Sequence, residues 1–196
     1  MRKHRTALAA GLLGTACVLL NGCINVVPFP RATSELADAK SLAKVLKRLA
    51  PEAKELLLQE RDVANQMKIT LEETSKADPA GFRKKLRDYQ NEMISVRNRR
   101  RDLVIAIGQG AYQSPLVFAV QQDAMRMMSD SVARTEGWIQ SAHNVQLRAD
   151  LGQTKDFPEL GSLNQQLGGF LMQVVSDPLI DQIHYLVQEF RFDAGV

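Results

Sequence analysis

The chain has 196 residues, of which 45% are hydrophobic and 24% charged, and this is enough for one domain with a substantial hydrophobic core. It carries 25 Lys and Arg against 22 Asp and Glu, a formal net charge of +3. The charges are unevenly distributed, because residues 23–101 hold 17 basic and 11 acidic side chains, whereas residues 102–196 hold 5 and 11. The sequence contains no glycine-rich phosphate loop, G-x-S-x-G or H-E-x-x-H, which excludes the commonest nucleotide-binding, serine hydrolase and zinc peptidase signatures.

The N-terminal segment has the composition of a secretory signal. A basic start, residues 1–5, precedes an apolar stretch over residues 7–20 that is short for a membrane span. The stretch ends in Leu20-Asn21-Gly22-Cys23, which resembles the lipobox of bacterial lipoproteins, although Asn21 stands where that family usually has a smaller residue. The resemblance covers residues 1–23 only. It implies cleavage before Cys23 and attachment of lipid to its thiol.

The same resemblance implies a location for the mature chain. Two or more long acyl chains on Cys23 would hold it permanently at a membrane, and Ile24, in place of Asp, implies sorting to the outer membrane. Loss of residues 1–22 removes three basic residues, so the mature chain is neutral overall, and lipid occupies its single cysteine. An ordinary secreted protein, cleaved after Ala16, is the alternative.

Beyond the cysteine, the sequence predicts a short tether followed by a single helical domain. Residues 24–33 contain two prolines and no helical period, and from residue 34 to the C-terminus at 196 apolar residues recur every three or four positions. Helix starts are expected where a capping residue or a first-turn proline occurs. The expected helices are 34–50, 51–75, 79–107, 115–148, 162–175 and one from 178 onward.

This pattern indicates an all-α fold, a bundle of about five or six helices with a long antiparallel hairpin over residues 51–107. Gly108 and Gly110 are expected to end the second arm of the hairpin, and residues 152–158 to form a loop. The region 105–120 allows another interpretation, two short strands around the glycines.

A basic block is the most distinctive local feature of the predicted hairpin. Eight Lys and Arg lie between residues 83 and 101, against only Asp88 and Glu92. Nucleic acid is excluded as a partner if the domain lies outside the cytoplasm, so anionic lipid, lipopolysaccharide phosphates or an acidic protein surface remain. A solvated face paired with acids of the preceding helix is the simpler alternative. The candidate binding residues are Arg97, Arg99, Arg100 and Arg101.

Two charged residues fall within apolar stripes. Arg100 lies seven residues from both Met93 and Ile107, and Glu60 interrupts the stripe of the preceding helix. A charge at a core position is costly unless it is paired. In a hairpin that turns near residue 77, facing residues have numbers that sum to about 155, the register of an antiparallel pair. We therefore predict an ion pair between Arg100 and either Glu55 or Glu60.

Groupings that could support catalysis or metal binding are weak. Ser41-Leu42-Ala43-Lys44 matches the S-x-x-K of serine penicillin-binding enzymes, but the K-T-G that must accompany it is missing. Asp181-x-x-His184 and Gln140-x-x-His143 supply only one carboxylate where a di-metal bundle needs several. We expect no catalytic residue, metal or cofactor.

The apolar segment 167–190 is expected to be core, or else a groove for a hydrophobic ligand or a partner helix, with Gly168-Gly169 allowing close approach of another helix or an acyl chain. Together these features favour a non-enzymatic outer-membrane lipoprotein whose helical domain faces the periplasm. Its expected partners are the membrane, through lipid on Cys23, and another envelope protein that it binds or helps to assemble. The alternative is a lipoprotein that binds a lipid or other hydrophobic ligand.

Overall fold

A computed structural model describes residues 33–73, 78–153, 157–173 and 176–196, so the predicted signal, Cys23 and most of the tether lie outside the described residues. The described residues form helices and no strand, which confirms the all-α prediction, and residues 105–120 are helix ends joined by a short connection. The helices are α2 (Thr33–Glu73), α3 (Pro79–Gly108), α4 (Pro115–Asp150), α5 (Pro158–Leu171) and α6 (Ile180–Phe190).

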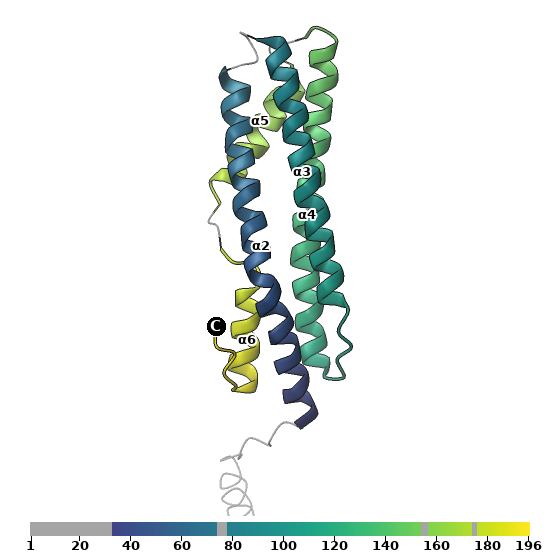
Figure 1. The fold of residues 1–196 in the computed structure, drawn as a ribbon, viewed down its shortest axis with the longest axis vertical. Helices are drawn as coiled ribbons and strands as arrows, with labels where there is room; N and C mark the ends of the chain where they lie inside the picture. Colours follow the sequence, from purple (N-terminus) through teal and green to yellow (C-terminus); the bar gives the residue numbers. More distant parts are fainter. Residues whose placement is uncertain (1–32, 74–77, 154–156, 174–175) are drawn as a thin grey trace, which may run out of the picture. The chain divides into compact units, whose positions relative to one another are not determined.

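The helices form an antiparallel bundle within the unit Ser34–Val196. The long helices α2, α3 and α4 lie side by side and alternate in direction (Figure 1). The shorter α5 and α6 follow one another and complete the bundle, α5 beside one half of the long helices and α6 beside the other (Figure 1).

Capping residues set the starts of α3 and α4 as the sequence predicted. Asp78 Oδ1 accepts a hydrogen bond from Gly81 N at 3.0 Å, and Ser114 Oγ accepts one from Val117 N at 3.4 Å. Each cap is followed by a proline, which has no amide hydrogen to leave unsatisfied in the first turn. These local signals therefore fixed both helix starts.

The expected boundaries of two helices were wrong, those of α2 and of α5, which also ends at Leu171, four residues before the expected end. Pro51 does not restart a helix but lies inside the continuous α2. The Pro51 ring is exposed, whereas the neighbouring Ala50 and Ala53 are buried against the other helices. Packing of this inner face therefore outweighs the helical hydrogen bond that proline cannot donate. The second error concerns α5, which begins at Pro158, four residues before the expected start, because the buried Phe157 anchors the chain there.

The connection between α3 and α4 is held by a buried glutamine. Gln121 Nε2 donates to the carbonyl oxygens of Ile107 at 2.7 Å and Gly110 at 2.9 Å. A Cβ on Gly110 would lie 2.5 Å from Tyr112 Oη, so a larger residue would collide with that ring. Gly108 ends α3 as predicted, and the absence of a side chain at Gly110 leaves room for the Tyr112 ring in this position.

The hydrophobic core is divided into two clusters along the bundle. One joins the first half of α2, the second half of α3, the first half of α4 and α6, with Leu46, Ile107 and Ile183 among its members. The other joins the opposite halves of the same long helices with α5, and Phe82 and Trp138 belong to it. The long helices are therefore shared by both clusters, while α5 and α6 each belong to one.

Candidate functional site

A buried polar layer lies between the two hydrophobic clusters. Glu60 on α2, Arg100 on α3 and Thr135 on α4 are at most 2% exposed. Arg100 Nη1 and Nη2 donate to Glu60 Oε1 and Oε2, each at 2.6 Å, a two-pronged contact of the strongest kind. The predicted ion pair of Arg100 is thus confirmed, with Glu60 as its partner.

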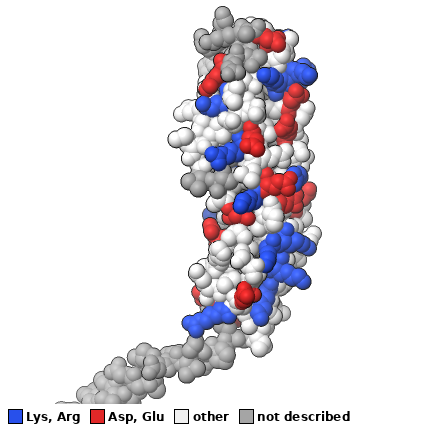
Figure 2. All heavy atoms as spheres, turned by 60° about the vertical axis from the view of Figure 1, so that its left-hand side comes forward, with Lys and Arg blue, Asp and Glu red and all other residues white. Residues whose placement is uncertain are grey.

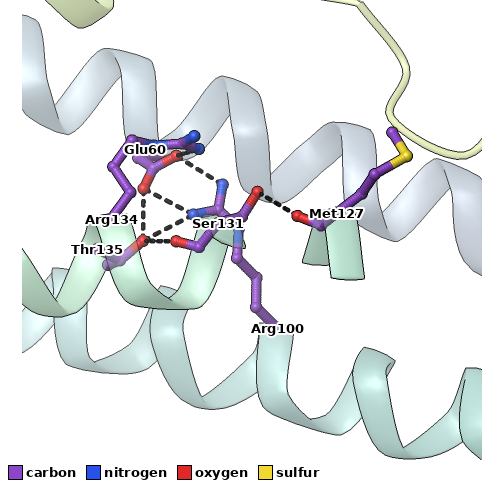
Figure 3. A network of polar contacts seen from close by, with 6 residues as sticks. All are labelled: Glu60, Arg100, Met127, Ser131, Arg134 and Thr135. Atoms are coloured by element: carbon purple, nitrogen blue, oxygen red, sulfur yellow. Dashed lines mark hydrogen bonds and ion pairs between the residues drawn. The ribbon is translucent and has the colours of Figure 1, made fainter. Parts of the chain in front are cut away.

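The third long helix completes the layer (Figure 3). The Thr135 hydroxyl accepts a hydrogen bond from Arg100 Nη1 at 2.8 Å and donates one to Glu60 Oε1 at 2.6 Å. Arg134 Nη2 lies 3.1 Å from Glu60 Oε2, and its guanidinium carbon lies 5.1 Å from the centre of the Phe170 ring on α5. Four helices therefore contribute to this polar layer and its aromatic flank.

The charges of the layer keep Glu60 ionised. Burial alone would raise the pKa of Glu60, but hydrogen bonds and positive charge from Arg100 and Arg134, together with the Thr135 hydroxyl, lower it below its ordinary value. Both carboxylate oxygens are occupied and the side chain is fully buried. Such a carboxylate cannot reach a substrate, so this arrangement is suited to aligning helices rather than to acid–base chemistry.

The other three candidate arginines face different neighbours. Arg97 Nη1 lies 2.7 Å from Glu136 Oε2 on α4, and Arg101 Nη2 lies 3.7 Å from the same oxygen. Arg99 points toward α2 instead, where Glu52 and Glu55 lie 3.3 and 3.4 Å from its Nη2.

The four arginines 97, 99, 100 and 101 consequently do not share one face. Arg100 is enclosed in the core, and the other three are paired with acids on either side of α3. Exposed ion pairs of this kind contribute little to stability, about 0–1 kcal/mol each, but they leave less charge free for a partner. The simpler alternative, pairing with acids of the preceding helix, therefore holds for Arg99, whereas Arg97 and Arg101 pair with the following helix α4.

An open groove of about 880 Å³ runs between α2 and α3. Its walls include exposed Asp62, Asp88 and Glu92, none of which forms an ion pair with any described residue. Lys85 and Arg99 are its basic lining residues. The groove is therefore apolar at Val63 and Met67, and mainly acidic along its walls.

One feature of the sequence could have predicted this groove, the position of two acids in the hairpin register. In the hairpin register of about 155, Asp62 faces Glu92, so two like charges oppose one another across neighbouring helices. Like charges in this position repel and favour an open surface that can accept a cation. Tyr89 also lines the groove, and burial together with the nearby charge of Glu60 raises the pKa of its hydroxyl.

A smaller cavity of about 180 Å³ lies where α5 gives way to α6. Ser131 and Arg134 of α4 line it, together with Leu57, Phe170 and Asp181. It adjoins the polar layer through Arg134. This cavity is below the size of about 300–1,000 Å³ that is typical of ligand pockets.

The remaining candidate residues are exposed and lie on three different helices. Ser41 and Lys44 are exposed on α2, and His143 and His184 are exposed on α4 and α6. Within the described ranges, no group of three or more His, Cys, Asp or Glu could hold a metal ion. Gly168 does not mark a close helix contact as expected, because an added Cβ would meet only Lys68 Cε, at 3.9 Å.

The apolar C-terminal segment is largely core. Its six most buried apolar side chains are at most 8% exposed and belong to the two clusters: Leu167, Phe170, Leu179, Ile183, Leu186 and Phe190. Among the helices of the described ranges, none combines the length and apolar character needed to cross a membrane.

The chain matches no protein family, no curated protein sequence and no solved structure.

Proposed function

We propose that this chain is an outer-membrane lipoprotein whose helical domain is a non-enzymatic module that binds another protein of the cell envelope. The observation that carries the proposal is Leu20-Asn21-Gly22-Cys23 at the end of a basic and apolar leader. Lipid on Cys23 would hold the domain at the membrane, and the domain would face the periplasm.

The groove between α2 and α3 is the surface that we assign to the partner. Asp62, Asp88 and Glu92, which form no ion pair with another described residue, give it negative charge, and Val63 and Met67 give it an apolar floor. A partner segment with basic residues around an apolar centre would complement both features. This groove replaces the Arg97–Arg101 segment as the preferred contact surface, because those arginines are paired within the chain.

A protein partner fits the geometry better than a hydrophobic ligand does. The groove is large enough for a ligand, but its walls carry four carboxylates, counting Glu55 with the three unpaired acids. An alkyl chain would leave those groups without compensation. The cavity between α5 and α6 has only about 180 Å³. Release of a bound lipid from the purified protein, detected by native mass spectrometry, would favour the ligand-binding alternative instead.

Replacement of Cys23 tests the anchor. Cys23→Ser should abolish incorporation of radiolabelled fatty acid and release the protein from the membrane fraction, because the serine hydroxyl does not replace the thiol as acyl acceptor. Cys17→Ser is the matched control, since Cys17 lies in the same apolar stretch, and it should retain labelling and membrane association. Continued lipid labelling of the Cys23→Ser chain would contradict the proposed anchor.

Charge reversal in the groove tests the partner. Chemical cross-linking in intact cells, followed by purification of the full chain, should yield a specific envelope protein. The variant Asp62→Lys/Asp88→Lys should capture at least tenfold less of this protein, which corresponds to a loss of about 1.4 kcal/mol in binding free energy. Asp102→Lys/Asp130→Lys, which reverses two exposed acids outside the groove, should keep it. Equal capture by both variants would exclude the groove, and no capture by the parent chain would exclude the interaction module.

A further inference from the structure

The first half of α2 carries a row of exposed basic side chains on one side of the helix. Lys40, Lys44, Lys47 and Arg48 follow one another at spacings of four, three and one, and Lys54 follows Lys47 by seven. These spacings place side chains on one helix face, and all five residues are exposed. Figure 2 shows the blue side chains gathered over the lower part of α2. We call these five residues the basic strip.

The basic strip differs from Arg97, Arg99 and Arg101 of α3, which are paired with acids of neighbouring helices. None of its members forms an ion pair with another described residue. Lys47 Nζ donates to the carbonyl oxygens of Ala194, at 2.8 Å, and Gly195, which are neutral acceptors and leave its positive charge in place.

The acids of α2 near the basic strip are directed elsewhere. Asp38 Oδ2 accepts hydrogen bonds from the backbone amides of Gln113 and Ser114, at 2.8 and 3.0 Å. Glu52 pairs with Arg99 on α3 at 3.3 Å. Asp38 and Glu52 therefore serve contacts within the bundle.

We propose that the basic strip lies against the phosphates of anionic lipid headgroups in the membrane to which the chain is anchored. This inference rests on the proposed attachment of lipid to Cys23. Nine residues separate Cys23 from Thr33, and the ten residue-to-residue steps between the two can span at most about 35 Å. Lys40 follows Thr33 by seven residues of helix, about 10 Å. The basic strip can consequently reach the surface that holds the anchor.

Electrostatics favours this placement over free tumbling of the domain. Each Lys or Arg near an anionic membrane strengthens association about fivefold, and the five members of the basic strip act together. The tether also makes their encounter with the surface intramolecular, which raises its effective concentration.

A membrane fits the basic strip better than a protein partner does. Protein interfaces depend on buried aromatic or apolar anchors, and the face that carries Lys40, Lys44 and Lys47 offers none: the exposed large apolar residues of α2 are Leu58 and Ile69, both beyond Lys54. A row of flexible ammonium groups without such anchors is suited to a layer of phosphates.

Lysine labelling of the reconstituted protein tests the inference. Lipidated chain purified from membranes is placed in vesicles of phosphatidylethanolamine with about one third phosphatidylglycerol, or in vesicles of phosphatidylcholine alone, the contrast that surface charge requires. Brief acetylation followed by mass spectrometry then reads each lysine. Lys40, Lys44 and Lys54 should react several-fold more slowly on the anionic vesicles, and about 1 M salt should remove the difference. Lys84 and Lys85, exposed at the other end of the hairpin, should react equally on both.

A pair of matched variants separates charge from other causes. In Lys40→Glu/Lys44→Glu, Lys54 should lose its protection on anionic vesicles. In Lys84→Glu/Lys85→Glu, which makes the same charge change away from the basic strip, Lys54 should keep it. If Lys54 of the parent chain is labelled equally on anionic and on phosphatidylcholine vesicles, the proposal is overturned.

Flotation of the vesicles reports on the anchor separately. A lipidated chain floats with phosphatidylcholine vesicles whatever the basic strip does. If the chain does not float with phosphatidylcholine vesicles, the proposed lipid anchor at Cys23 is contradicted. Flotation with anionic vesicles alone, lost at high salt, would then still support the basic strip, and flotation with neither would overturn both.

Discussion

At the scale of single residues, the Glu60–Arg100 pair links sequence and structure most directly. Both residues interrupt apolar stripes, and the register of an antiparallel hairpin brings them together. Their contacts with Thr135 and Arg134 follow from the position of a third helix. A buried ion pair of this kind need not increase stability, because removing two charges from water costs several kcal/mol. We interpret the polar layer as a device that fixes the register of three helices.

A double-mutant cycle tests this interpretation. Arg100→Met should destabilise the protein by about 3 kcal/mol or more, because Glu60 remains buried with only the partly exposed Arg134 as its charge partner. Glu60→Leu/Arg100→Met should recover most of this loss, since no uncompensated charge remains. Urea unfolding followed by circular dichroism measures both. A double variant whose loss equals the sum of the losses of Arg100→Met and Glu60→Leu measured singly would show no coupling between the two side chains and would contradict the interpretation.

At the scale of helices, Pro51 is a position where the local preference of the residue and the packing of the bundle favour different structures. A proline inside a helix removes one hydrogen bond and crowds the carbonyl of the residue four positions earlier, which here is Lys47. The inner face around it is nevertheless continuous, because Leu49, Ala50, Ala53 and Leu56 all belong to one core cluster. Figure 1 shows a bend in the axis of α2, the usual consequence of such a residue.

Replacement of this proline should stabilise α2. Pro51→Ala restores a backbone donor at an exposed position, and we expect a gain of about 2 kcal/mol after the greater entropy of the unfolded chain is subtracted. Thermal unfolding would show this as a higher Tm with unchanged helix content. Pro178→Ala, outside the helices, is the control and should change Tm little. A lower Tm for Pro51→Ala would mean that the bend itself is needed for packing.

At the scale of the whole domain, the structure separates two kinds of charged surface. The basic strip occupies the first half of α2, whereas the acidic groove lies between the second half of α2 and the first half of α3. The proposed membrane contact and the proposed protein contact thus use different parts of one bundle. The labelling experiment and the cross-linking experiment can fail independently, because Lys40→Glu/Lys44→Glu changes only the basic strip and Asp62→Lys/Asp88→Lys changes only the groove.

The sequence alone determined the properties that depend on local chemistry. Apolar residues every three or four positions predicted the helices, and Asp78-Pro79 and Ser114-Pro115 predicted two helix starts. Hairpin register limited the partner of Arg100 to Glu55 or Glu60, of which the structure shows Glu60. Only the tertiary structure decided that Pro51 stays within a helix and that α5 and α6 cover different halves of the bundle. It also decided which Lys and Arg side chains have no ion-pair partner among the described residues. The reason is that pairing of Arg97 or Arg99, and freedom of Lys40 or Lys44, depend on neighbours from other helices, and helical periodicity carries no information about those neighbours.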